Sequence, residues 1–417
     1  MKSIVKILAG VLITVNAVAF TACTDDDFTA SIFDTTEYSL DKASYTFPLD
    51  TFLKKNCLEP YNLKYIYKME DIGSDLDKNL VPINYENATV LAVLSKYLWF
   101  DVYKKIVGEE FLKQYSPRII HLIGSHSFNP TSGTETLGVA EGGVKVTLIR
   151  GNFLDVNNIE YMNEYFFGTM HHEFSHILQQ NVITPTAFDA ISKSLYNPID
   201  WNNTADSLAV TKGFISPYAS SQAREDWVEV IAKYVTMDMK KWDATLEAAR
   251  YDWEELEYNA KAFDAAIARG ANRDTLGYHI IRTVGGDPEV GSKKDGEIDT
   301  WKIQRKLIQR NADGSAVLDE NQKPIFRFED GVDGRAIILQ KLEMARQWLK
   351  DNFNVDLEAL RMEVQRRQFL TDADGNFVFD AKGNYVNRFT SPSESDPTRM
   401  FIDELLDEVN QYKALQQ

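Results

Sequence analysis

The pentapeptide His172-Glu173-Phe174-Ser175-His176 constrains this chain more than any other feature. On an α-helix, residues four apart lie on the same face, so both imidazoles would reach toward one point. Zn²⁺ accepts histidine nitrogens at roughly 2.0–2.1 Å in a tetrahedral arrangement. Glu173 would lie on the adjacent edge of the helix, where its carboxylate can take a proton from a metal-bound water. The pattern therefore predicts a zinc centre with its own general base.

The residues around this motif favour a buried helix, which we predict over residues 159–180. Apolar side chains recur at helical spacing before and after the motif: Tyr161, Met162, Tyr165, Phe166, Met170, Ile177 and Leu178. An exposed surface helix that carries the motif by chance would have polar flanks instead.

A third metal ligand has to come from elsewhere, because no Gly and third His follow the motif. The best candidate segment is 218–229, a loop that enters a predicted helix over residues 224–239. Glu225 and Glu229 are four apart and share a face of that helix. Asp226 is the alternative ligand. A helix start that is merely rich in acids is the other interpretation, since acidic residues favour helix N-termini.

This spacing resembles that of gluzincins with a late third ligand, the group that includes the catalytic domain of anthrax lethal factor. In that group a Tyr precedes the ligand Glu by seven residues and a second Glu follows it by four, positions that Tyr218 and Glu229 occupy here. The resemblance implies that Glu225 is the third zinc ligand. It also implies that Tyr218 donates a hydroxyl to the developing oxyanion and that Glu229 steadies a ligand. It covers only residues 160–239.

The first 22 residues predict a lipoprotein signal peptide. A basic head precedes an apolar stretch, residues 7–20, that is short for a membrane span. Small residues then precede Cys23, which would become the lipidated first residue of the mature chain, although Phe20 stands where Leu is usual. The segment 24–28, with three consecutive aspartates, resembles the acidic tag that sends lipoproteins of Bacteroides-type bacteria to the cell surface. The alternative is a secreted protein in which Cys23 is incidental.

The chain as a whole resembles the zinc-binding metallopeptidase lipoproteins of Bacteroides-type bacteria, also described as substrate-import-associated zinc metallohydrolases. The resemblance rests on the N-terminal signal, the segment 172–180 (HEFSHILQQ) and the segment 225–229 (EDWVE). It implies an outer-membrane lipoprotein, exposed at the cell surface, that cleaves a peptide or protein substrate with Zn²⁺. It also implies a link to a TonB-dependent importer.

Composition limits the remaining possibilities. The formal net charge of −17 argues against a nucleic-acid partner, which requires a basic surface. The 44% hydrophobic and 12% aromatic residues are typical of a folded chain. With Cys23 lipidated, Cys57 has no disulfide partner, and we expect it to be a small buried residue.

The hydrophobic pattern predicts an α+β fold of the zincin-like kind, predominantly helical, with a small twisted sheet and the HExxH helix. We expect a signal peptide over residues 1–22, a lipidated tether over 23–45, a catalytic region over 46–240 and a mostly helical C-terminal region over 241–417. The further expected elements are strands within 118–125 and 137–149, helices over 91–107, 243–269, 335–352 and 356–367, and β-hairpins at 312–319 and 373–380. The strand at 144–149 is the expected edge for strand addition by a peptide.

Two other functions remain open from the sequence. One is a non-catalytic surface lipoprotein that binds nutrient polymers for an importer and keeps the zincin frame as a scaffold. The other keeps the zinc chemistry but acts on a different amide, in a glycoconjugate or a cell-wall peptide. Intact Glu173 and Tyr218 favour an enzyme, because a scaffold needs neither.

Overall fold

The computed structural model describes residues 40–69, 79–128, 138–141, 144–250, 253–257, 265, 268–269, 278–284, 298–306, 308–325 and 332–416. The predicted signal peptide, Cys23 and most of the predicted tether lie outside these residues. The residues from Leu40 to Gln417 form one compact unit. Over the described ranges, no helix combines the length and the apolar character needed to cross a membrane.

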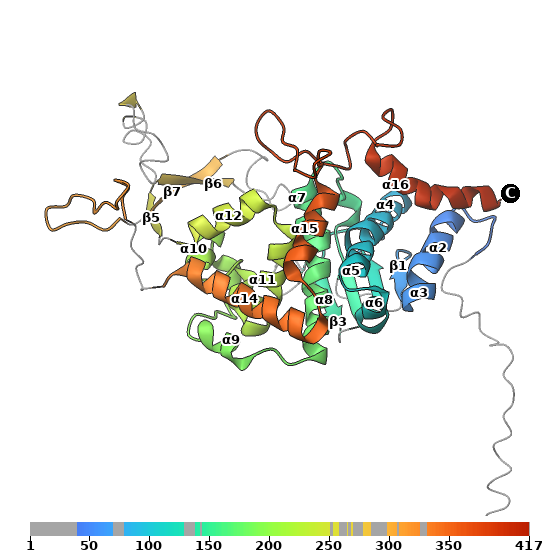
Figure 1. Cartoon of the computed structure of the whole chain (residues 1–417), viewed down its shortest axis with the longest axis horizontal. Coiled ribbons are helices and arrows are strands. Elements are labelled where there is room, and N and C mark those ends of the chain that lie inside the picture. Colours follow the sequence, from blue (N-terminus) through green and yellow to red (C-terminus); the bar gives the residue numbers. More distant parts are fainter. Residues whose placement is uncertain are drawn as a thin grey trace, which may run out of the picture. The chain divides into compact units, whose positions relative to one another are not determined.

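Two helices, α8 (Gly168–Asn181) and α11 (Ala223–Thr236), pack against each other (Figure 1). Each buries an apolar face, and removal of that surface from water is the main stabilising contribution. Phe174 of α8 and Trp227 of α11 are both 1% exposed. Trp227 packs between the rings of Phe188 and Trp348, with centroids 4.8 and 5.3 Å away. Trp227 therefore anchors α11 in the core.

Two later helices, α14 (Gly334–Phe353) and α15 (Leu357–Gln368), pack on α11 (Figure 1). Both confirm the predicted helices, and both begin at an aspartate that caps the helix. The side chain of Asp333 accepts a hydrogen bond from the Ala336 amide, and that of Asp356 accepts one from the Ala359 amide. The C-terminal third of the chain therefore supports the helix that carries Glu225.

A four-stranded sheet contains β1 (Lys64–Ile66), β2 (Ile119–Leu122), β3 (Gly138–Glu141) and β4 (Lys145–Leu148) in the order β1-β2-β4-β3. Strands β1, β2 and β4 run parallel to one another, and β3 runs antiparallel to β4. Helix α8 contacts β3 and β4. The expectation that the strand at 144–149 is the edge is wrong, because β4 has hydrogen-bonded neighbours on both sides. The edge strand next to α8 is β3.

Two predicted helices are real but contain a wider π-type turn. The predicted helix over 91–107 comprises α4 (Tyr85–Ser95), η2 (Lys96–Phe100) and α5 (Asp101–Ile106), and the one over 159–180 comprises α7 (Ile159–Met162), η4 (Asn163–Phe167) and α8. Such turns are frequent near functional sites. The other helical elements are α2 (Phe47–Leu53), η1 (Lys54–Leu58), α3 (Glu59–Tyr61), α6 (Glu109–Tyr115), η3 (Gly151–Phe153), α9 (Thr186–Ile191), η5 (Trp201–Asn203), α10 (Asp206–Thr211), η6 (Tyr218–Ser221), α16 (Phe401–Asn410) and η7 (Gln411–Gln416).

The long helix predicted over 243–269 is wrong. Helix α12 (Met239–Ala248) ends early, and the chain then forms β5 (Trp253–Glu257). Strand β5 pairs antiparallel with β7 (Ile298–Lys306), which also pairs with β6 (Tyr278–Val284). A local pattern cannot show a partner strand that comes so much later in the sequence, and here the non-local pairing overrides helix propensity.

Both predicted hairpins are present, and each belongs to a larger repeated unit. In the second unit, the amides of Leu370, Val386 and Val378 donate in a ring to the carbonyls of Val386, Val378 and Leu370, at 2.9–3.0 Å. The first unit repeats this ring with three residues at equivalent positions: Gln309, Ile325 and Val317. Gly314 and Gly375 adopt φ of +85° and +83° at equivalent turns, which a glycine adopts without strain.

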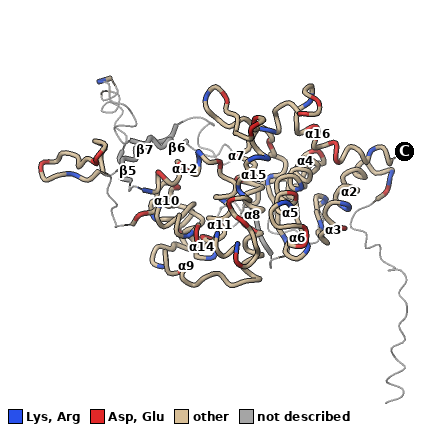
Figure 2. Tube along the Cα trace, viewed as in Figure 1, with Lys and Arg blue, Asp and Glu red and all other residues tan. Residues whose placement is uncertain are grey.

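Acidic and basic residues are interspersed along the described helices (Figure 2). Some of them join helices that are far apart in sequence. Lys105 of α5 and Glu363 of α15 form one such pair, with nitrogen and oxygen 2.6 Å apart. Because the lysine side chain is 61% exposed, this pair contributes little to stability. The buried contacts of α8 and α11 therefore dominate the packing around the motif.

Candidate metal centre

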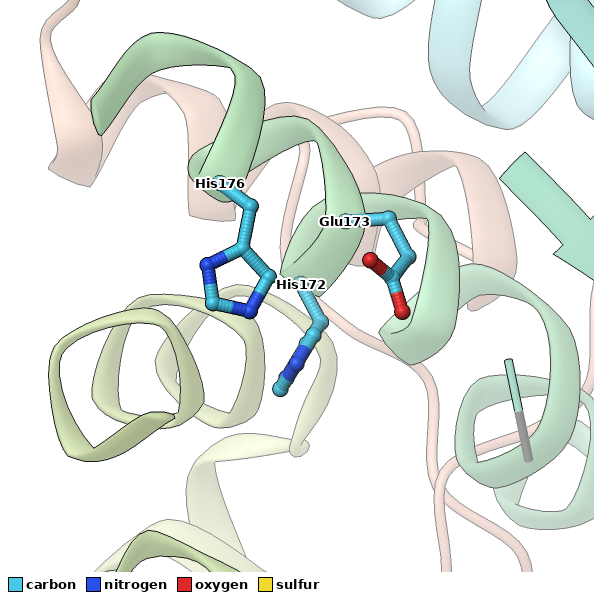
Figure 3. Close-up of side chains that lie close together, drawn as sticks. All are labelled: His172, Glu173 and His176. Carbon is cyan, nitrogen blue, oxygen red and sulfur yellow. The ribbon is translucent and has the colours of Figure 1, made fainter. Parts of the chain in front are cut away.

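The two histidines of the motif project from the same side of α8, and Glu173 lies on the neighbouring side (Figure 3). All three side chains are buried, with exposed fractions of 8% for His172, 6% for Glu173 and 4% for His176. Each offers one ligand atom, and these three atoms lie within 4.8 Å of one another. The helix therefore presents three potential metal-binding groups in a small buried volume.

Glu225, in the first turn of α11, meets both imidazoles. Its Oε2 lies 3.2 Å from His172 Nε2 and 3.1 Å from His176 Nε2. Ligands held at roughly 2.0–2.1 Å around a tetrahedral zinc are separated by about 3.3 Å. The oxygen thus lies from each nitrogen at nearly the spacing of two corners of such a tetrahedron.

The outer nitrogens of both rings have their own partners, which defines where the protons lie. His172 Nδ1 is 2.8 Å from Glu229 Oε1, and His176 Nδ1 is 3.0 Å from Gln179 Oε1. Both partners can accept a hydrogen bond, so with a metal on Nε2 the Nδ1 atoms would carry the protons. Each Nε2 can then direct a lone pair at a cation, and the Glu225 carboxylate offers a third donor to the same cation. The donor set therefore fits a metal ion.

The surrounding carboxylates favour positive charge between the two imidazoles and Glu225. Burial opposes charging of His172, but hydrogen bonds with Glu225 and Glu229 outweigh it and raise its pKa to about 10. Burial would raise the pKa of Glu225, yet its contacts with His172 and His176 hold that pKa well below the usual range. Burial would also raise the pKa of Glu229, but its hydrogen bond with His172 outweighs burial and lowers that pKa to about 2. Both carboxyl groups are therefore ionised near neutral pH.

Glu173 has a different environment. Burial raises the pKa of its carboxyl, and the neighbouring His172 and His176 act in the opposite direction. A carboxylate with a raised pKa is a stronger base than an exposed one. Glu173 therefore combines the position and the basicity of a proton acceptor.

Tyr218 lies against the centre from η6. Its ring is 5.9 Å from that of His172, nearly parallel at 28°, and 37% of the residue is exposed. Trp201 packs on it edge-on, with centroids 4.8 Å apart. Burial and the nearby charge of Glu225 raise the pKa of Tyr218 above its ordinary value. Its hydroxyl therefore stays protonated as a hydrogen-bond donor, with Glu225 among its partners.

Asp226, the alternative third ligand, lies away from the two histidines. Its Oδ2 is 2.6 Å from Lys341 Nζ and accepts a hydrogen bond of 2.9 Å from the Tyr196 hydroxyl. Asp226 is fully buried, at 0% exposure. His171 also lies away from the centre, buried with its Nδ1 3.1 Å from the Tyr103 hydroxyl. Burial lowers the pKa of His171 to about 3, so this histidine is a neutral structural residue.

Sequence reasoning missed three residues around the centre: Gln179, Ser216 and Arg224. Gln179 follows His176 by three positions, a helical spacing that could have indicated it. Ser216 donates a hydrogen bond of 2.5 Å to Glu229 Oε2, from a loop whose sequence carries no such signal. The Nε of Arg224 lies 3.3 Å from His176 Nδ1.

The hydrogen bonds that join Ser216, Glu229 and His172 predict that changes to Glu229 or Ser216 weaken zinc binding. We expect Glu229→Gln to weaken zinc binding by about 10–100-fold, because His172 loses an ionised partner that orients its ring. Ser216→Ala should have a smaller effect in the same direction. Competition with a fluorescent zinc chelator measures both affinities, with Ser192→Ala, a buried serine of another loop, as the control. Unchanged affinity in Glu229→Gln would show that Glu229 does not support the ligand.

With this geometry in view, comparison with known proteins is informative. Residues 42–358 match the family described as "Putative zinc-binding metallo-peptidase". The chain belongs to this family. The matched region contains the whole centre, from α8 to α11, and the family resemblance inferred from the sequence is confirmed.

One solved structure of this kind is similar along most of the chain. It is the crystal structure of a "putative zinc-binding metallo-peptidase" from Bacteroides caccae, with 32% sequence identity and a TM-score of 0.51. The similarity covers 81% of this chain and 95% of that one. The predominantly helical α+β fold with a small sheet is therefore shared with that protein. No curated protein matches the sequence.

Proposed function

We propose that this chain is a zinc-dependent peptidase of the gluzincin type, in which His172, His176 and Glu225 hold the metal. The observation that carries the proposal is the Glu225 oxygen, 3.2 and 3.1 Å from the two Nε2 atoms. A buried carboxylate that lies within 3.2 Å of two imidazole nitrogens forms a donor set suited to a cation. Membership of a metallopeptidase family supports zinc as that cation.

The chemistry divides among four side chains. Zinc, when bound, polarises the scissile carbonyl and makes a water molecule more acidic. Glu173 accepts the proton of that water and returns it to the leaving amine. The Tyr218 hydroxyl donates a hydrogen bond to the carbonyl oxygen as it gains negative charge. Glu229, held by Ser216, accepts a hydrogen bond from His172 Nδ1 and so keeps the His172 ring oriented.

The arrangement of the sheet supports a zincin-like reading of the fold. The motif helix α8 contacts β3 and β4, and β3 is the antiparallel edge strand of that sheet. An edge strand has unpaired backbone groups that can pair with an extended peptide. We therefore place the substrate backbone along β3, with its scissile bond over His172 and His176.

The cellular setting is proposed from the sequence alone. Lipidation at Cys23 would anchor the chain in the outer membrane, and the acidic segment 24–28 favours exposure at the cell surface. A peptidase in that place could supply peptides to a TonB-dependent importer. These residues lie outside the described ones, so the support is the resemblance to the lipoprotein signals of Bacteroides-type bacteria.

The metal content of purified protein tests the proposal directly. We expect about one zinc per chain in the wild type and less than a tenth of that in Glu225→Ala after dialysis, because one ligand in three is removed. Glu343→Ala, an exposed glutamate on α14, is the matched control and should retain the metal. Mass spectrometry of the metal measures all three proteins. A wild type that holds no zinc after zinc is supplied and excess washed away would contradict a zinc enzyme.

A further inference from the structure

Arg224 is a cation beside the centre that the catalytic mechanism leaves unused. It lies in the first turn of α11, immediately before Glu225, and its side chain is exposed. Its Nε is 3.3 Å from His176 Nδ1. Among the described residues, no carboxylate forms an ion pair with it. An arginine so close to the proposed ligands therefore has free hydrogen-bond donors.

Once a metal is bound, His176 can no longer accept a hydrogen bond from Arg224. A metal on Nε2 takes that lone pair, so Nδ1 carries the proton and donates it to Gln179 Oε1, 3.0 Å away. The Nε–H of Arg224 then faces an N–H rather than an acceptor. A guanidinium has five N–H donors and no acceptor, and it pairs best with a carboxylate or phosphate oxygen. The group is therefore available to an anion.

The position of Arg224 places such an anion near the reacting bond. The Nε of Arg224 touches the ring of His176, one of the two histidines of the centre. Residues of an extended peptide rise about 3.3 Å each, so a group next to a ligand ring lies within one or two residues of the scissile bond. His172 instead has the ring of Tyr218 beside it, and Trp201 packs on Tyr218. The centre thus has a cationic side and an aromatic side.

We propose that Arg224 forms an anion subsite that binds a carboxylate of the peptide substrate close to the bond that is cleaved. The inference rests on the proposed peptidase function and names a substrate class for it. Glu173, Glu225 and Glu229 would otherwise repel an anionic substrate, and Arg224 offsets that repulsion beside His176. The carboxylate comes either from an acidic side chain or from a free C-terminus, and both present the same chemistry to a guanidinium.

Matched peptides separate these two sources. The full chain is given fluorogenic peptides that carry Glu or Gln next to the scissile bond, and peptides that end there in a free carboxylate or an amide. The variants are Arg224→Gln, Arg224→Glu and Arg366→Gln, the last an exposed arginine on α15 as control. The readouts are kcat, KM, zinc content, and the affinity of uncleaved peptides for the Glu173→Gln variant, measured by calorimetry with and without Arg224→Gln.

We expect Arg224→Gln to raise KM and weaken affinity about 10–100-fold for the peptides with the recognised carboxylate, the effect of losing a charge-assisted hydrogen bond. The uncharged peptides, the zinc content and kcat should change by less than about threefold. Arg224→Glu should reverse the preference, so that a Lys peptide is cleaved better than a Glu peptide. A preference for Glu over Gln identifies an acidic side chain, and a preference for free acid over amide identifies a C-terminus.

Three results would overturn the proposal, and they differ in what else they affect. If the wild type cleaves peptides without regard to either carboxylate, the subsite is wrong and the peptidase stands. If Arg224→Gln loses zinc and slows every peptide equally, Arg224 only supports His176. A wild type that holds zinc yet cleaves and binds no peptide would remove the proposed peptidase function and the subsite with it.

Discussion

Replacing Glu173 with Gln is expected to lower kcat by about 10²–10⁴-fold while the protein keeps one zinc per chain. The amide has nearly the shape of the carboxylate, so the buried volume around the residue, which is 6% exposed, stays filled. It cannot accept a proton from water or return one to the leaving amine. The loss should therefore appear in kcat, with a small change in KM.

The measurement is steady-state cleavage of a peptide together with metal analysis of the same sample. Glu160→Gln is the matched control, because Glu160 is exposed on α7 and pairs with Lys241 rather than with the centre. The control should retain full activity. If Glu173→Gln also retained full activity, Glu173 would not be the proton acceptor, and another group would have to take that role.

The local features of this molecule could be predicted from the sequence, because they depend on spacing along one helix. Apolar flanks at helical intervals indicated a buried helix, and the structure has α7, η4 and α8 across the predicted range. On such a helix His172 and His176 must share a face, whatever the rest of the chain does. The motif therefore predicted the convergence of two imidazoles that the structure contains.

The choice between Glu225 and Asp226 could not be made from the sequence. Neighbouring residues on a helix point about 100° apart, so only one of them can face α8. The partner that holds Asp226 on the other side, Lys341, is on a helix more than a hundred residues later. A distant partner also explains why the helix predicted over 243–269 was wrong, because β5 depends on pairing with β7. Ser216 is another case, since only the fold brings its loop to Glu229.

The pair of Asp226 and Lys341 leads to the second large prediction. Both side chains are 1% exposed, with Oδ2 and Nζ 2.6 Å apart. Burial raises the pKa of Asp226 to about 6 and lowers the pKa of Lys341, and each ion opposes the shift of the other. Lys341 also donates to the Gly213 carbonyl at 2.8 Å. Each ion is tolerated in the core because the other one is there.

We expect Asp226→Asn or Lys341→Met to lower the free energy of unfolding by about 3–5 kcal/mol, because a buried charge loses its partner. The double variant should cost clearly less than the sum of the single ones, since it removes both ions. Urea denaturation measures all three. Glu343→Gln, in an exposed pair with Arg346, should leave the unfolding midpoint unchanged.

The same variants decide between a structural and a metal-binding role for Asp226. Because Asp226 faces Lys341 and Tyr196, the folded fraction of Asp226→Asn should still bind one zinc per chain, whereas Glu225→Ala should lose zinc. The two neighbouring acids would then have separate effects, one on stability and one on metal binding. Loss of zinc from Asp226→Asn at unchanged stability would instead make Asp226 the third ligand, and the roles assigned to α11 would be reversed.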